Sequence, residues 1–168
     1  MANKTNFTGE EWGRVLSSPM VAGMAITAAD PSGLWGLLKE GMAGGWALLE
    51  ARQSAGADPL VKATAEDFAT NEGRAAARAA LQQRFTGTTF NAIKDTALAE
   101  LKAVATIIDE KAPEDAAAFK AWLLQVAGKA AEAGTEGGFL GFGGVSVSEA
   151  EKATLAEISK ALNGKTPA

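Results

Sequence analysis

The chain contains no histidine, no cysteine and no tyrosine among its 168 residues. Without imidazole or thiol groups it cannot form a Ser-His-Asp or Cys-His catalytic arrangement, a zinc site with nitrogen or sulfur ligands, or an iron–sulfur cluster. Nor can it form a disulfide, so an oxidising compartment would bring it no stabilisation of that kind. The absence of disulfides is compatible with the cytoplasm, where we expect the protein to reside. Because no catalytic motif replaces the missing groups, we also expect that it is not an enzyme.

Residues that favour β-strands are also scarce, with only 7 Val and 5 Ile in the whole chain. Alanine, the strongest helix former, occurs 37 times. This composition predicts an all-α fold. We expect one compact domain over residues 1–168, a bundle of six to eight helices with a Gly-rich loop before the last helix. The two ends, residues 1–7 and 164–168, are expected to be frayed.

The charge and the hydropathy of the chain exclude further classes of partner. A net charge of −4 and a pI near 5.0 argue against a nucleic-acid partner, which requires a basic surface for phosphate contacts. The longest uncharged apolar run, residues 15–29, contains two serines and a proline. It is shorter than the roughly 20 apolar residues of a membrane-spanning helix. We therefore expect a soluble protein without a transmembrane segment.

Proline positions mark three expected helix starts. A capping residue stands directly before proline at Ser18-Pro19, Asp30-Pro31 and Asp58-Pro59. Proline is favoured at the first position of a helix, and a preceding Ser or Asp caps the free N–H groups of the first turn. We therefore expect a short first helix to end before Ser18 and a new helix to begin at each of the three prolines.

Two capping boxes and two apolar stripes predict most of the remaining helices. Thr8 with Glu11, and Ser148 with Glu151, have the spacing in which a hydroxyl and a carboxylate cap a helix start reciprocally. Further helices are expected at residues 71–85, 90–111, 113–134 and 148–163. Apolar residues at helical spacing predict the core faces of two of them: Phe90, Ile93, Ala97, Leu101, Val104 and Ile108 in one, and Phe119, Trp122, Leu123, Val126 and Ala130 in the other.

The segment of residues 137–148 combines five glycines with Phe139, Leu140 and Phe142. A phosphate-binding loop would require Lys-Ser/Thr after the glycines, which is missing here. Two main interpretations remain for Phe139 and Phe142. They are apolar plugs that fold back onto the core, which we favour, or they belong to a lid or binding element with exposed rings.

Large adaptable side chains gather in the first third of the chain: Trp12, Met20, Met24, Trp35, Met42 and Trp46. Most are expected in the core. Trp35, however, lies roughly 100° around the helix from the apolar stripe that begins at Leu34, which predicts an exposed patch. The sequence thus favours a non-catalytic binding or assembly module without a cofactor. Its partner would be a protein, a small apolar ligand or a second copy of the chain. The candidate contact residues are Trp35, Trp46, Phe139 and Phe142.

Residues 144–151, Gly-Val-Ser-Val-Ser-Glu-Ala-Glu, followed by Leu155, Ile158 and Leu162, resemble the loop-and-helix segment of tellurite-resistance TerB-like domains. That resemblance implies an all-helical module that binds a divalent cation such as Ca²⁺ through carboxylates, in bacterial stress response. It implies Asp30, Glu149 and Glu151 as ligands, although the family's loop aspartate corresponds to Gly143 here. The alternative reading is that these acidic residues complement the dipoles of helix N-termini.

Overall fold

The computed structural model describes residues 2–29, 58–136 and 147–164 of the chain. Within these ranges the structure contains helices and no strand, which confirms the predicted all-α class. The elements are η1 (Lys4–Asn6), α1 (Gly9–Ala29), α4 (Pro59–Phe68), α5 (Asn71–Phe85), η2 (Phe90–Ala92), α6 (Ile93–Lys111), α7 (Ala116–Glu136) and α8 (Glu149–Asn163), where η denotes a single 3-10 turn. No helix in these ranges is both long and apolar enough to cross a membrane.

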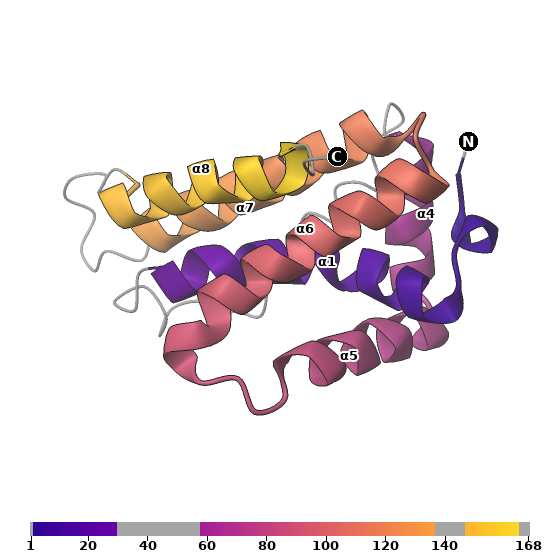
Figure 1. The fold of residues 1–168 in the computed structure, drawn as a ribbon, viewed down its shortest axis with the longest axis horizontal. Coiled ribbons are helices and arrows are strands. Elements are labelled where there is room, and N and C mark those ends of the chain that lie inside the picture. The colour runs from indigo at the N-terminus through magenta and orange to yellow at the C-terminus, as the bar shows by residue number, and fades with distance from the viewer. Residues whose placement is uncertain (1, 30–57, 137–146, 165–168) are drawn as a thin grey trace.

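Helix α1 lies at the centre of the described part of the molecule and contacts each of the five other α-helices that the structure describes. Figure 1 shows α7 and α8 side by side on one side of α1, with α5 on the opposite side and α6 crossing between them. Because α1 is surrounded in this way, apolar residues occur around much of its circumference. Its buried residues include Trp12, Leu16, Val21 and Ile26.

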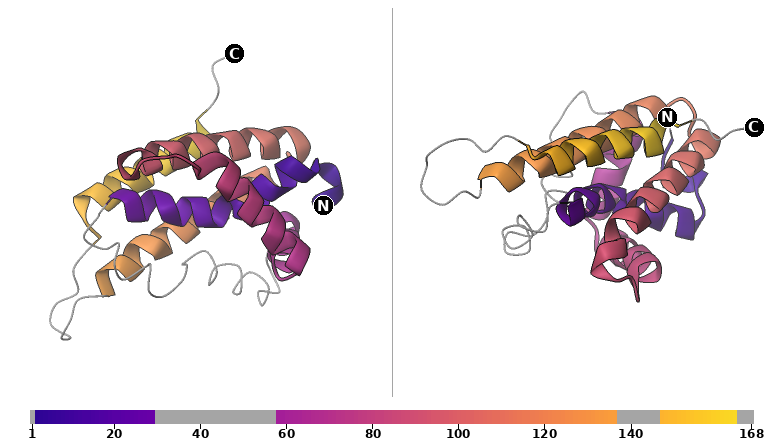
Figure 2. Two further views of the ribbon diagram at one scale, coloured as in Figure 1. Left: turned by 90° about the horizontal axis from the view of Figure 1, so that it is seen from below. Right: turned by 60° about the vertical axis from the view of Figure 1, so that its left-hand side comes forward.

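The predicted helix break at Ser18-Pro19 is wrong, because α1 continues through Pro19 to Ala29. Proline has no N–H to donate to the carbonyl four residues before it, which here belongs to Val15. The Ser18 hydroxyl donates to this carbonyl oxygen instead, at 2.7 Å. Serine therefore satisfies the acceptor that proline leaves free, and the axis of α1 changes direction partway along its length (Figure 2).

The other described helix starts follow the predicted capping chemistry. Asp58 caps α4 by accepting a hydrogen bond from the Leu60 N–H at 3.0 Å, with proline at the first position. Both predicted capping boxes are present, at Thr8 with Glu11 and at Ser148 with Glu151. The expected start at Pro113 shifts, because residues 113–115 form a turn and α7 begins at Ala116.

The predicted core faces of α6 and α7 are largely confirmed. Side chains with 0–1% exposure are Leu101, Val104 and Ile108 on α6, and Phe119, Leu123, Val126 and Ala130 on α7. Trp122 is half-buried, with its ring edge-to-face against Phe119. The prediction for Phe90 is wrong, since its side chain is 42% exposed. Phe90 lies in η2, whose three residues per turn take it off the α-helical stripe.

Two contacts hold residues 2–7 of the N-terminal arm against the bundle. The Ala2 N–H donates to the Asp115 carboxylate at 2.6 Å, and both residues are buried. Phe7 packs its ring against Trp12, with 5.4 Å between the ring centroids. The arm is therefore held at its start by Asp115, 113 positions away in sequence, and at its end by the neighbouring Trp12 of α1. The helix expected from Asp30-Pro31 and the loop of residues 137–146 lie outside the described ranges.

Candidate functional site

Most of the residues that the sequence singles out for function lie outside the described part of the structure. These are the contact candidates Trp35, Trp46, Phe139 and Phe142, and the candidate metal ligand Asp30. Their roles stay predictions. Glu149 and Glu151 are the candidates that the structure describes, at the start of α8.

Glu149 and Glu151 both interact with groups of their own helix start. The Glu151 side chain is buried and turns back toward Ser148, whose backbone N–H and hydroxyl donate to Oε2 at 2.8 and 2.9 Å. Glu149 is exposed and accepts a hydrogen bond from Lys152 at 2.7 Å, which lowers the pKa of Glu149. The two carboxylates thus stabilise the first turn of α8. Across residues 2–29, 58–136 and 147–164, acidic side chains form no group of three that would hold a metal ion.

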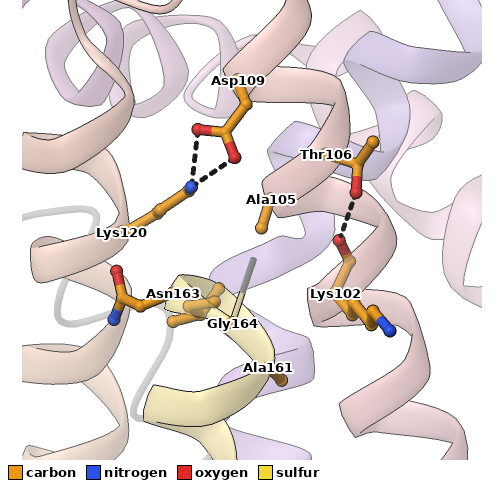
Figure 3. A pocket seen from close by; sticks show the side chains of 9 residues that line it. Lys102, Ala105, Thr106, Asp109, Lys120, Ala161, Asn163 and Gly164 are labelled. Carbon is orange, nitrogen blue, oxygen red and sulfur yellow. Dashed lines mark hydrogen bonds and ion pairs between the residues drawn. The ribbon is translucent and has the colours of Figure 1, made fainter. Parts of the chain in front are cut away.

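A polar pocket lies where the C-terminal end of α8 meets α6 and α7 (Figure 3). Its volume is about 220 Å³, and at about 30 Å³ per molecule it has room for roughly seven waters. The lining residues come from all three helices: Lys102, Ala105, Thr106, Asp109, Lys120, Ala161, Leu162, Asn163 and Gly164. Pockets for drug-sized ligands start near 300 Å³, so this one fits only a small molecule.

The polar groups of this pocket are largely paired with one another. The Lys120 ammonium donates to both carboxylate oxygens of Asp109 at 2.6 Å. The Thr106 hydroxyl donates to the Lys102 carbonyl, and the Asn163 amide donates to a carbonyl within α8. Lys120 is nearly buried, with a side chain 10% exposed. Its charge is compensated by Asp109 and by the negative end of the α8 dipole. Within the pocket, the charges of Lys120 and Asp109 thus offset each other.

An ion-pair network on the other side of α1 was not foreseen from the sequence. Glu100 of α6 is buried at 6% exposure and accepts two hydrogen bonds from the Arg14 guanidinium, at 2.6 and 2.9 Å. Arg84 of α5 lies 3.7 Å from the same carboxylate and also pairs with Glu10 at 3.0 Å. The network joins α1, α5 and α6. A bidentate arrangement of this kind fixes the register of packed helices more than it adds net stability.

Four helix ends meet at one end of the bundle. Figure 1 shows the C-terminal ends of α1 and α7 and the N-terminal ends of α6 and α8 together on the left. Phe90, in the 3-10 turn that leads into α6, belongs to this end. Among the described residues, Phe90 is the large apolar side chain that is clearly exposed to solvent. We call this region the Phe90 end of the bundle.

The chain matches no protein-family model, no curated protein and no solved structure. The resemblance of residues 144–151 to TerB-like domains therefore stays a prediction that rests on those residues.

Proposed function

We propose that this protein is a non-catalytic binding module that presents an aromatic patch to a protein partner at the Phe90 end of the bundle. The observation that carries the proposal is the exposure of Phe90, at 42%, in the turn that leads into α6, on the side of the bundle where α1 and α7 end and α8 begins. A single exposed apolar side chain is ordinary on a protein surface. Phe90 is informative because the helix ends that lead into the Trp- and Phe-containing segments lie on the same side of the bundle.

Two segments that contain aromatic residues begin at this end of the bundle, and the longer one leads from here to α4 at the opposite end. Residues 137–146, which include Phe139 and Phe142, connect the end of α7 to the start of α8. Residues 30–57, which include Trp35 and Trp46, follow directly after α1. The C-terminal ends of α1 and α7 and the N-terminal end of α8, where these segments start or finish, lie at the Phe90 end (Figure 1). This convergence supports one shared patch over several separate ones.

The residue types in the proposed patch suit a protein partner better than a small ligand. Trp and Phe are enriched at the buried centres of protein–protein interfaces, where a few such side chains supply most of the binding free energy. The described pocket between α6, α7 and α8 is small and polar, and it lies away from the Phe90 end. A small apolar ligand or a second copy of the chain would bind the same patch in a different stoichiometry.

The test is quantitative affinity capture with variants of the full-length chain. Phe90→Glu and Trp35→Glu each place a charge in the proposed patch. Ala117→Glu adds the same charge at an exposed position at the opposite end of α7, where a helix N-terminus accepts it. We expect a protein that is captured by the wild type and by Ala117→Glu, and that is lost from both patch variants. Far-UV spectra and melting curves of the three variants establish that each is folded.

Other outcomes of the same set of proteins would overturn the proposal. Equal capture by wild type, Phe90→Glu and Trp35→Glu would show that binding occurs elsewhere. Concentration-dependent light scattering that is abolished by Phe90→Glu would assign the patch to self-association. Displacement of a hydrophobic fluorescent dye by small apolar compounds, again sensitive to Phe90→Glu, would assign it to a small ligand.

A further inference from the structure

Helix α8 ends at Asn163, and the next residue is Gly164. This is the one Asn-Gly pair in the sequence. Both residues are exposed, and both line the polar pocket beside Lys120 (Figure 3). We propose that Asn163 is a site of spontaneous deamidation, that the end of α8 restrains the reaction, and that the product adds a negative charge to this pocket.

The chemistry requires only the two residues and water. The backbone nitrogen of Gly164 attacks Cγ of Asn163 and loses its proton, and the bond from Cγ to Nδ2 breaks. Nδ2 takes up a proton and leaves as ammonia, which gives a five-membered succinimide. Water then opens the ring at either carbonyl and yields aspartate or isoaspartate. Glycine favours the attack because no Cβ shields its nitrogen.

The helix end holds both reacting nitrogens in hydrogen bonds. The Gly164 N–H, the nucleophile, donates to the Lys160 carbonyl at 2.7 Å. The Asn163 amide nitrogen, the leaving group, donates to the Ser159 carbonyl at 3.1 Å. For the ring to close, the Gly164 nitrogen must leave its acceptor and turn toward the Asn163 side chain. Deamidation therefore proceeds through opening of the last turn of α8.

Glycine is also the residue that the end of α8 accommodates. A Cβ added at position 164 would lie 2.5 Å from the Lys160 carbonyl oxygen, which is closer than side-chain atoms approach. The same glycine that permits the capping hydrogen bond thus makes Asn163 chemically reactive. The product carboxylate would stand at the negative end of the helix dipole, so it should weaken this end of the helix.

The first experiment measures the rate of modification at Asn163 by peptide mapping and mass spectrometry, with isoaspartate detected separately. The folded full-length protein is compared with a synthetic peptide of residues 159–168 in the same mildly alkaline buffer. Because a hydrogen bond at a fraying helix end opens readily, we expect the folded protein to react more slowly by about two- to tenfold. Asn163→Gln, which would need a six-membered ring, should remain unmodified at this position in both.

The second measurement is the melting temperature of Asn163→Asp, which carries the product side chain. We expect it to lie about 1–4 °C below that of the wild type, because a carboxylate at a helix C-terminus is unfavourable. Equal rates in the folded protein and the peptide would overturn the proposed restraint. Absence of modification in the peptide would overturn the reactive site itself, and an unchanged or raised melting temperature would overturn the effect on the helix end.

Discussion

Two proline junctions in this molecule have the same local chemistry and different structures. At Asp58-Pro59 the chain is extended at Asp58, and the carboxylate caps the first turn of α4. At Ser18-Pro19 the backbone is helical on both sides, and the Ser18 hydroxyl turns back to the Val15 carbonyl. The side chain before proline thus forms its hydrogen bond with the following turn at Asp58 and with the preceding turn at Ser18.

The difference follows from the surroundings of each junction. Ser18 and Pro19 are buried within the central helix, with apolar residues on both sides in contact with the core. Asp58 and Pro59 are only half-buried, at the start of a peripheral helix. Burial on both sides of Pro19 outweighs the roughly 3 kcal/mol by which proline disfavours a helix interior. Local start signals therefore apply where the surroundings leave the chain free to turn.

The largest expected effect comes from truncating α1 on either side of Pro19. Leu16 lies before the proline and Ile26 after it, and they are 0% and 1% exposed. If α1 is one helix packed along its whole length, Leu16→Ala and Ile26→Ala should each lower the free energy of unfolding by about 2–5 kcal/mol. Denaturant titration measures both. A loss below about 1 kcal/mol for Ile26→Ala would show that the half after Pro19 is docked only loosely.

The hydroxyl of Ser18 provides the next test. Ser18→Ala leaves the buried Val15 carbonyl without a partner and should cost about 1–3 kcal/mol. Ser17→Ala is the matched control, because the Ser17 hydroxyl donates to the Arg14 carbonyl, which the Ser18 N–H already serves in the regular helical pattern. Equal losses for the two variants would contradict the assignment of Ser18 as the substitute donor.

At the other junction, Asp58 should behave as an ordinary helix cap. Asp58→Ala removes the acceptor for the Leu60 N–H and should cost about 1 kcal/mol, whereas Asp58→Asn keeps a cap and should cost little. Thermal unfolding of the two variants at neutral pH separates these effects. A loss as large for asparagine as for alanine would mean that the charge of Asp58, and not its hydrogen bond, stabilises α4.

The same pair gives a pH dependence with a defined sign. Burial raises the pKa of Asp58 above its usual 3.8, and the charge of Asp115 raises it further. Because the native state then binds the proton more tightly, the contribution of Asp58 to stability grows as the pH falls toward 3.8 and is lost as the pH rises through the native pKa. The melting temperature of the wild type minus that of Asp58→Asn should therefore increase as the pH is lowered from neutral to 4. A constant difference would contradict the raised pKa.

Local signals in the sequence were sufficient for much of the fold. The high alanine content indicated the all-α fold class, and capping and helix-breaking residues indicated the bounds of α5 and α8. The core faces of α6 and α7 followed from the spacing of Leu101, Phe119 and their neighbours. These features depend on residues within a few turns of one another, which is the range that periodicity and capping patterns report.

Features that depend on tertiary contacts could not be predicted. The Arg14–Glu100 pair joins residues 86 positions apart, and neither residue carries a signal of its partner. Glu100 lies at the edge of the apolar stripe of α6, one turn from Ala97 and Val104, and its burial there is possible because α1 supplies the matching guanidinium. For the candidate binding site, the sequence supplied the aromatic residues. The convergence of helix ends at Phe90 emerges only from the fold.

A capping residue followed by proline starts a helix at Pro59 and lies inside one at Pro19. Replacing each proline by alanine tests most directly whether the surroundings of the junction decide between these two structures. Pro19→Ala removes the roughly 3 kcal/mol penalty of an interior proline, loses two buried methylenes at about 0.8 kcal/mol each, and frees the unfolded chain at a cost of about 0.4–1 kcal/mol. It should therefore stabilise the protein by about 0.4–1 kcal/mol. Pro59→Ala lets the unfolded chain adopt more conformations, so it should lower the free energy of unfolding by about 0.4–1 kcal/mol. Our account predicts melting temperatures that shift in opposite directions, up for Pro19→Ala and down for Pro59→Ala. A fall in both would contradict a helix that runs unbroken through Pro19.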